Sequence, residues 1–231
     1  MPLAFALLLA ALVAPSPGPE TPAPNIVLVL ADDLGIGDAR CYNPDSKVPT
    51  PAIDRLAREG RRFTDAHSPS AVCTPTRYAL LTGRYAWRSR LHRWVLDGYG
   101  RLLVDRPTVA TAFDEAGYTT ACIGKWHLGL GAFDPDEPGR KADYGGPFAA
   151  GPHTCGFDEV FILPASLDMP PYAFVRGDAL EEPLTAETPG SERRWSGGGG
   201  FWREGPMAPS FDFEQVLPRV VEEACTFLEQ V

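Results

Sequence analysis

The sequence lacks the features that define several common protein classes. Its five cysteines include no CxxC pair, which counts against a zinc ribbon or a thioredoxin-like redox motif. No apolar run reaches the roughly 20 residues that a membrane-spanning helix needs, and no segment is repeated. The 21 Lys and Arg residues are outnumbered by 30 Asp and Glu residues, which gives a formal net charge of −9. This balance argues against nucleic acid or an anionic membrane as a general partner, and an anionic substrate would need a locally positive pocket.

The first 24 residues predict an export signal followed by a Pro-rich linker. Residues 3–13 form one apolar run, which has the length of a signal-peptide h-region and is too short to cross a bilayer. No Lys or Arg precedes it, and the prolines between Pro15 and Pro24 would stop a helix. The alternative is a buried N-terminal helix. We expect an exported protein, periplasmic or extracellular, with no integral membrane segment after signal removal.

The chain contains enough apolar sequence for a folded domain. Its 231 residues are 44% hydrophobic and 22% charged, so a sizeable core is expected. Short apolar runs alternate with segments of helical periodicity, which is typical of an α/β fold whose mostly parallel sheet is flanked by helices. Strands are expected at residues 25–30, 62–66 and 118–123, helices at 50–60, 75–83, 108–117 and 213–231, and long surface loops at 133–150 and 178–210.

Two adjacent carboxylates, Asp32 and Asp33, follow the first expected strand. Ligands of open α/β sheets bind outside the carboxyl ends of the strands. Adjacent carboxylates repel each other unless a cation lies between them, and calcium or magnesium suits oxygen ligands. The alternative is a solvated loop in which one Asp caps a turn. The pair is therefore a candidate metal site.

Cys73 is a candidate reactive residue. It stands at or just before the N-terminus of the helix expected from Pro75 to Gly83, where the dipole and free N–H groups favour an anion. Arg77 lies one turn further and can direct its guanidinium at the same anion. The alternatives are a buried, inert cysteine and, more distantly, a thiolate hydrolase for which no partner triad is evident. The odd number of cysteines also leaves at least one unpaired in an exported chain.

The segment around this cysteine resembles a known signature. Residues 73–77 read Cys-Thr-Pro-Thr-Arg, and residues 80–84 read Leu-Leu-Thr-Gly-Arg. This sequence is similar to the signature of the formylglycine-dependent sulfatases, which belong to the alkaline phosphatase-like superfamily. The commoner form of the signature has Ser where this chain has Thr76.

A second segment extends the resemblance toward the N-terminus. Residues 25–35, which end in Ala-Asp-Asp-Leu-Gly, resemble the first strand and metal-binding aspartates of the family. The resemblance implies that Asp32 and Asp33 bind calcium, or magnesium, together with the modified residue at Cys73.

Two later segments complete the resemblance in the same order. Residues 124–129, Gly-Lys-Trp-His-Leu-Gly, resemble a second signature, which implies sulfate binding by Lys125 and a place beside the nucleophile for His127. Residues 156–168 resemble a segment in which Ser166 is the polar active-site residue. Taken alone, these three side chains would be a solvated cation, a hydrogen-bonded loop histidine and an ordinary loop serine.

The resemblance implies a mechanism and partners. A separate maturing enzyme oxidises Cys73 to formylglycine, and one hydroxyl of its hydrated aldehyde attacks sulfur so that the alcohol leaves. Deprotonation of the other hydroxyl then expels sulfate. Arg77 would hold the surroundings of the modified residue, Lys125 would bind sulfate, and His127 would assist the elimination. The implied substrate is a sulfated small molecule or glycan.

Members of this family are usually much longer and draw further metal ligands from later sequence. We therefore expect residues 25–231 to be the N-terminal part of a catalytic domain that is truncated at its C-terminus, with little or no activity alone. Two other functions remain open: a phosphate or phosphonate monoester hydrolase of the same superfamily, and a non-catalytic exported fragment.

Overall fold

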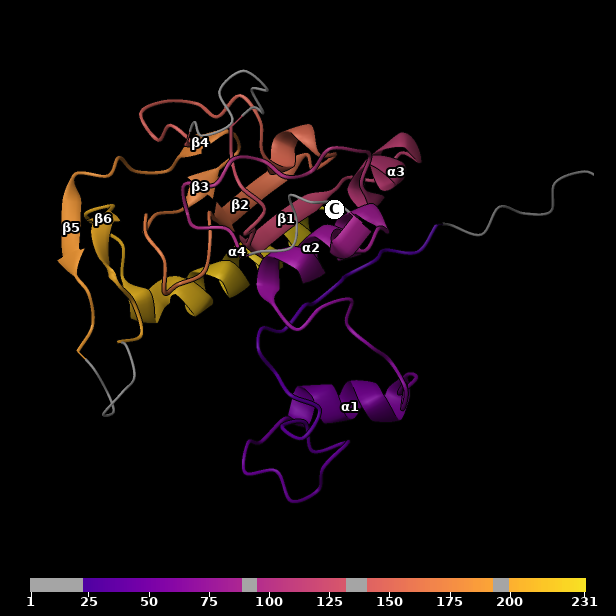
Figure 1. The fold of residues 1–231 in the computed structure, drawn as a ribbon. Coiled ribbons are helices and arrows are strands. Elements are labelled where there is room, and N and C mark those ends of the chain that lie inside the picture. Colours follow the sequence, from indigo (N-terminus) through magenta and orange to yellow (C-terminus); the bar gives the residue numbers. More distant parts are fainter. Residues whose placement is uncertain (1–22, 89–94, 132–140, 193–199) are drawn as a thin grey trace, which may run out of the picture. The chain divides into compact units, whose positions relative to one another are not determined.

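The structure is a computed structural model that describes residues 23–88, 95–131, 141–192 and 200–231 (Figure 1). The predicted signal segment at residues 3–13 lies outside these ranges. The chain divides into two compact units, Met1–Arg62 and Phe63–Val231. Across the described ranges, no helix combines the length and apolar character needed to cross a membrane.

The helix expected at residues 50–60 is confirmed in the first unit as α1, Pro51–Glu59. The Thr50 hydroxyl accepts the Arg40 N–H at 3.0 Å and donates to Asp54 Oδ1 at 3.1 Å. Asp54 Oδ1 also accepts the Cys41 N–H at 2.8 Å. Asp54 therefore ties the helix to the preceding loop.

The strands expected at residues 25–30 and 62–66 are wrong, because both segments lie outside regular secondary structure. The apolar side chains from Ile26 to Leu30 are 43–84% exposed. A run of this kind becomes a buried strand only when other strands supply its hydrogen bonds. None of the strands in the described ranges pairs with either segment.

The second unit is built on a mixed four-stranded sheet of order β1-β2-β3-β4 (Figure 1). β1, Ala121–Lys125, and β2, Glu159–Leu163, are parallel and in register from Ala121 opposite Glu159 to Lys125 opposite Leu163. β3, Val175–Arg176, and β4, Ala179–Leu180, continue the sheet in antiparallel fashion. The α/β class is confirmed, and the strand expected at 118–123 begins three residues later.

The helices of this unit follow their sequence signals. The Thr108 hydroxyl accepts the Thr111 N–H at 3.2 Å and so caps α3. Gly83 ends α2 in the left-handed conformation, with φ of 64°. The helical elements are α2 Cys73–Thr82, α3 Val109–Glu115 and α4 Val216–Gln230, with short 3-10 turns at Ala86–Arg88, Pro152–Thr154 and Phe213–Gln215.

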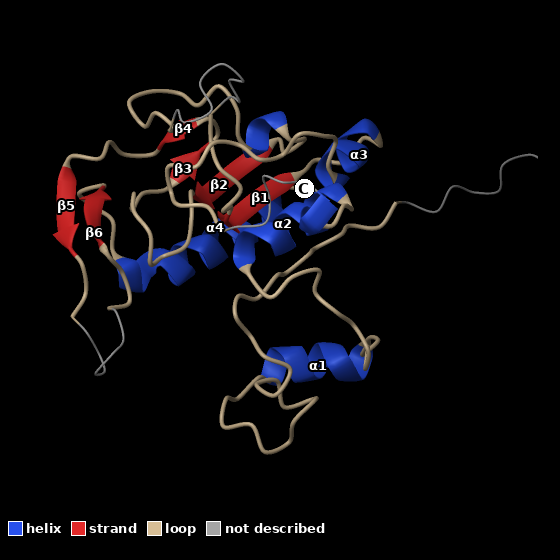
Figure 2. Ribbon diagram, in the orientation of Figure 1, coloured by secondary structure: helices blue, strands red, loops and turns tan. Residues whose placement is uncertain are grey.

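The loop expected at residues 178–210 is partly wrong, because it contains regular structure. Besides β4, it forms a separate antiparallel pair, β5 Ala186–Pro189 and β6 Glu204–Met207 (Figure 2). Trp202 stacks on Phe213 with 4.0 Å between ring centroids, and its indole N–H donates to the Thr188 hydroxyl at 3.1 Å. These contacts are distant in sequence, so local composition did not indicate them.

Strand β2 is buried on both faces of the sheet. Val160 and Ile162 of β2 belong to one apolar cluster, which also contains Tyr78 of α2. Phe161 and Leu163, which point the opposite way, belong to a second cluster that includes Val216 of α4. The sheet therefore lies between α2 and α4, and apolar side chains pack against β2 on both faces.

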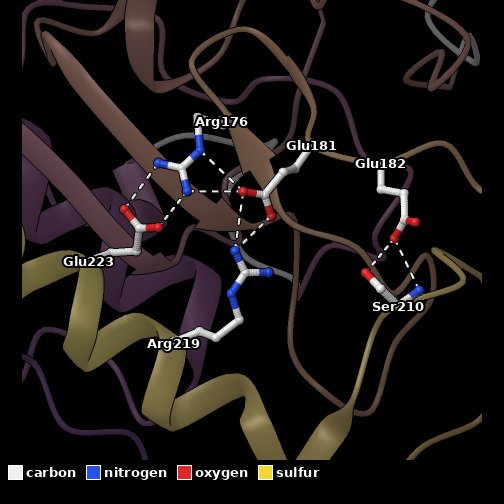
Figure 3. A network of polar contacts seen from close by, with 6 residues as sticks. All are labelled: Arg176, Glu181, Glu182, Ser210, Arg219 and Glu223. Atoms are coloured by element: carbon white, nitrogen blue, oxygen red, sulfur yellow. Dashed lines mark hydrogen bonds and ion pairs between the residues drawn. The ribbon is translucent and has the colours of Figure 1, made fainter.

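An ionic network links α4 to the outer strands (Figure 3). Arg176 bonds Glu181 at 3.0 Å and both carboxylate oxygens of Glu223, while Arg219 bonds Glu181 at 2.9 Å. The Arg219 guanidinium also lies 4.7 Å from the ring centroid of Phe174. Because these charged side chains are 25–47% exposed, we expect each pair to contribute only about 1 kcal/mol or less.

Two glycines with the same backbone angle give a matched test of packing at the end of the second signature. Gly129 and Gly117 both have φ of 83°. A Cβ on Gly129 would lie 1.9 Å from the Arg101 carbonyl oxygen, whereas one on Gly117 would meet nothing within 4 Å. Gly117→Ala should cost about 1–2 kcal/mol from the left-handed backbone alone.

Gly129→Ala should cost at least about 3 kcal/mol, because overpacking adds to that strain. Urea denaturation of both variants measures the two costs. Equal losses of unfolding free energy in the two variants would show that the backbone around Arg101 moves to accommodate the added methyl group at little cost.

Candidate active site

The predicted nucleophile and its partners meet at one edge of the sheet. Lys125 is the last residue of β1, and Ser166 follows β2 by three residues. Because β1 and β2 are parallel, their carboxyl ends lie at the same edge. The pairing continues past the strands, since the N–H groups of Trp126 and His127 donate to the carbonyls of Leu163 and Pro164 at 3.0 and 3.1 Å.

The Lys125 ammonium connects two predicted site residues. Its Nζ lies 3.2 Å from Cys73 Sγ and 3.3 Å from Ser166 Oγ. Cys73 and Ser166 are both partly exposed, so solvent and small molecules can reach them. The structure therefore brings together three side chains that lie up to 93 positions apart in the sequence, Cys73, Lys125 and Ser166.

Cys73 is the first residue of α2, as the sequence predicted. The preceding residue, Val72, has an apolar side chain and makes no side-chain cap. Pro75 carries no N–H, and the first helical hydrogen bond runs from the Thr76 N–H to the Val72 carbonyl at 3.2 Å. The positive end of the helix dipole is thus directed at Cys73 without a capping carboxylate or hydroxyl, and it adds to the Lys125 charge.

Arg77 and Thr76 fix the first turn of α2 to its surroundings. Arg77 donates a hydrogen bond to the Lys125 carbonyl, which joins the helix to the end of β1. The Thr76 hydroxyl donates to the Ser70 carbonyl at 2.8 Å. A serine hydroxyl could make this same bond, so the contact does not distinguish Thr76 from the commoner serine of the signature.

His127 is fully buried and adopts a left-handed backbone, with φ of 58°. This conformation costs about 1–2 kcal/mol in a residue other than glycine. Its Nε2 lies 2.7 Å from the Leu96 carbonyl oxygen. Burial lowers the pKa of His127, and the positive charges of Lys125 and Arg77 lower it further. The imidazole is therefore neutral at physiological pH.

The sequence reasoning missed two partners of His127. Thr74, inside the first signature, donates its hydroxyl to the His127 carbonyl at 3.0 Å and accepts the Leu96 N–H at 3.1 Å. Leu96 contributes only backbone groups, so no side-chain signal could have identified it. Thr74 could have been suspected because a buried hydroxyl next to a nucleophile needs a partner. The nearby His67 is exposed and pairs with Asp65 at 2.7 Å.

The predicted metal ligands Asp32 and Asp33 belong to the other unit, Met1–Arg62. Carboxylate oxygens suit calcium or magnesium, but calcium takes about six to eight such ligands. No group of three or more His, Cys, Asp or Glu side chains that could hold a metal occurs in the described ranges. These residues therefore supply at most part of a coordination sphere, and the metal role of Asp32, Asp33 and Cys73 stays a prediction.

The cysteines differ in chemical environment, although none is in a disulfide within the described residues. Burial raises the pKa of Cys155 to about 11 and that of Cys122 to about 12. At pH 8 only about one molecule in 10³ or fewer would carry either thiolate. Cys155 is buried, Cys225 is exposed, and Cys41, Cys73 and Cys122 are partly exposed.

Alkylation therefore should separate these thiols. Iodoacetamide at pH 8 should modify Cys225 and the partly exposed Cys41 and unmatured Cys73 while the chain is folded. It should spare Cys155, which is buried, and Cys122, whose raised pKa keeps the thiol protonated. Peptide mass mapping measures the extent at each position, and a urea-unfolded sample, in which all thiols react, serves as the control. Modification of Cys155 as fast as Cys225 in the folded chain would contradict the burial described above.

Comparison with known proteins agrees with this geometry. The Sulfatase family model matches residues 24–178. The N-acetylgalactosamine-6-O-sulfatase of Bacteroides thetaiotaomicron is 44% identical over 160 residues, which make up 68% of this chain and 30% of that protein. Human arylsulfatase A is 44% identical over 137 residues, or 57% of this chain and 27% of that protein. The chain thus spans less than a third of the length of these relatives.

Solved structures show the same likeness. One of them, described under the metabolism of multiple glycosaminoglycans by Bacteroides thetaiotaomicron, has a TM-score of 0.75 and 32% sequence identity. The match covers 90% of this chain and 48% of that one, which confirms the alkaline phosphatase-like α/β fold. Since the family model covers more than half of the sequence, the chain belongs to the sulfatase family.

Proposed function

We propose that the protein hydrolyses sulfate monoesters through a formylglycine formed from Cys73. One observation carries the proposal: the Lys125 ammonium lies 3.2 Å from Cys73 Sγ and 3.3 Å from Ser166 Oγ at the uncapped N-terminus of α2. A sulfate ester needs positive groups where negative charge develops. This edge of the sheet supplies them, although the chain as a whole is acidic.

The surroundings of Cys73 fit the modified residue. The Cys73 sulfur marks the place where the oxygens of formylglycine would lie, within reach of the Lys125 donor. In the family, the hydrated aldehyde supplies one hydroxyl that attacks sulfur and a second whose deprotonation releases sulfate. The net reaction consumes water and the ester and yields an alcohol, sulfate and a proton.

The side chains of this chain have distinct roles in the proposal. Lys125 and Ser166 bind sulfate oxygens, and the N-terminus of α2 stabilises the same negative charge. Arg77 holds the end of β1 against α2 through the Lys125 carbonyl and so keeps the ammonium in place. His127, neutral and buried, takes up the proton that is released from the nucleophile side.

Asp32 and Asp33 would bind a divalent cation, calcium or magnesium, together with the modified position 73. Such a cation would neutralise the sulfate charge and orient the nucleophile. The family uses a divalent metal in general, and the two carboxylates are suitable but incomplete ligands.

The substrate, location and partners follow from the relatives. One relative is named an N-acetylgalactosamine-6-O-sulfatase, so we propose a sulfated glycan, with smaller sulfate esters as alternatives. Residues 1–24 would direct export, and residues 25–231 would form the N-terminal part of the catalytic domain. A sulfatase-maturing enzyme would act on Cys73.

Maturation and turnover test the proposal together. Because residues 25–231 alone are expected to have little or no activity, the protein is expressed in full from its gene, with any sequence that continues beyond the 231 residues, together with a formylglycine-generating enzyme. Mass spectrometry of the peptide around position 73 measures conversion. The converted protein should hydrolyse an aryl sulfate in preference to the matching aryl phosphate. Preference for the phosphate would favour a phosphate or phosphonate monoester hydrolase. An unmodified Cys73 after co-expression would favour a non-catalytic protein.

Substitution of Lys125 tests the observation that supports the proposal, the contact of its ammonium with Cys73 and Ser166. Lys125→Met removes the ammonium with little change of length and should lower kcat/KM for the aryl sulfate by about 10²- to 10³-fold. Lys141→Met, which removes an exposed lysine lying 5.4 Å from the Tyr99 ring centroid, should change kcat/KM less than about threefold. Equal effects of the two substitutions would remove Lys125 from the site.

A further inference from the structure

Three polar groups around His127 form a closed hydrogen-bonded ring. The Thr74 hydroxyl donates to the His127 carbonyl at 3.0 Å and accepts the Leu96 N–H at 3.1 Å. The ring closes at His127 Nε2, which lies 2.7 Å from the Leu96 carbonyl oxygen. Thr74 and His127 are both fully buried, so their mutual bond is shielded from water, whereas Leu96 is partly exposed.

The ring determines which imidazole nitrogen carries the proton. A carbonyl oxygen has only lone pairs, so the contact with Leu96 requires that Nε2 be the N–H donor. The imidazole is neutral because burial lowers its pKa, and a neutral imidazole has a single N–H. Nδ1 is therefore the unprotonated nitrogen. It is buried and accepts no hydrogen bond from the described residues.

We propose that Thr74 is a positioning residue that fixes the Nε2–H tautomer of His127 and thereby presents Nδ1 as a proton acceptor. The inference deepens the proposed function, because the use of that acceptor in sulfate ester hydrolysis rests on it. Thr74 acts on both sides of the contact. Its hydroxyl accepts the Leu96 N–H, which holds Leu96 in place, and donates to the His127 carbonyl, which holds the backbone of His127.

The position of Thr74 in the sequence connects the hydrogen bonds of His127 to the predicted nucleophile. It follows Cys73 directly and is the second residue of α2. The hydroxyl therefore links the helix that carries the nucleophile to the segment 126–128 that carries the histidine. A shift of the helix would change the orientation of His127 at the same time.

The test compares Thr74→Val with Thr74→Ser. Valine keeps the shape but removes the hydroxyl and leaves the Leu96 N–H without its acceptor, whereas serine keeps the hydroxyl. The readout is the tautomer of His127 at neutral pH, from ¹⁵N spectra of histidine-labelled chain. The sequence has four histidines, and His127→Asn assigns the signal. Thr120→Val, which removes another buried hydroxyl that bonds the Gly156 carbonyl at 2.7 Å, is the control.

The wild-type chain should show a protonated Nε2 and a bare Nδ1. Thr74→Val should give a mixture of tautomers, whereas Thr74→Ser and Thr120→Val should keep the wild-type pattern. In the matured protein, Thr74→Val should lower kcat by roughly 10- to 100-fold with little change in KM, and Thr74→Ser should restore most of it.

A wild-type Nδ1–H tautomer would overturn the inference even if Thr74→Val did not fold. An unchanged tautomer in folded Thr74→Val would also overturn it. The tautomer is measured without turnover, so absence of sulfatase activity in wild type would refute the proposed function separately.

Discussion

The parallel pairing of β1 with β2 is the constraint on which the site depends. It sets Lys125 opposite Leu163, and the N–H groups that follow continue the ladder to Pro164. A register shift of one residue would turn Lys125 to the opposite face of the sheet. The contact between its ammonium and both Cys73 and Ser166 would then be lost. Site geometry is therefore a direct consequence of main-chain hydrogen bonding.

Local electrostatics differ in sign from those of the whole chain. The formal charge of −9 would repel an anionic ester at long range. At the end of β1, however, the Lys125 ammonium and the uncapped start of α2 act over a few ångströms, where screening by water and salt is weakest. The acidic side chains that are paired with arginines lie elsewhere, for example Glu181 and Glu223 beside α4. The start of α2 beside Lys125 is thus a place where a negative charge would be stabilised in an otherwise acidic chain.

Much of the site could be predicted from sequence, because its chemistry lies in short contiguous motifs. The helix after Cys73, the strand before Lys125 and the helix after Thr108 were all expected from neighbouring residues, although the bounds of the first two differ by two or three residues from those expected. The spatial grouping of Ser166 with Lys125 could be expected only through family resemblance, since 41 positions separate the two residues. Sequence alone thus identified the chemistry better than its geometry.

The predictions that were wrong or incomplete have a common cause: each depends on a partner that is distant in sequence. Residues 25–30 have strand-like composition but lack a strand partner among the described residues, and β5 pairs with β6 despite loop-like composition. Leu96 takes part through its backbone alone, so its side chain gives no indication of its role. Sequence patterns indicate which secondary structure a segment prefers. Whether a strand forms also depends on a partner segment that supplies its hydrogen bonds.

The alternation of β2 between two apolar clusters limits how this protein can diverge. Val160 and Ile162 serve one cluster and Phe161 and Leu163 the other, so four consecutive positions are confined to apolar residues by packing alone. None of them belongs to the chemistry of the site, yet a smaller side chain at any of them would loosen one layer beside Ser166. Relatives that keep this geometry should therefore keep apolar side chains at all four positions, although none of them makes one of the polar contacts of the site.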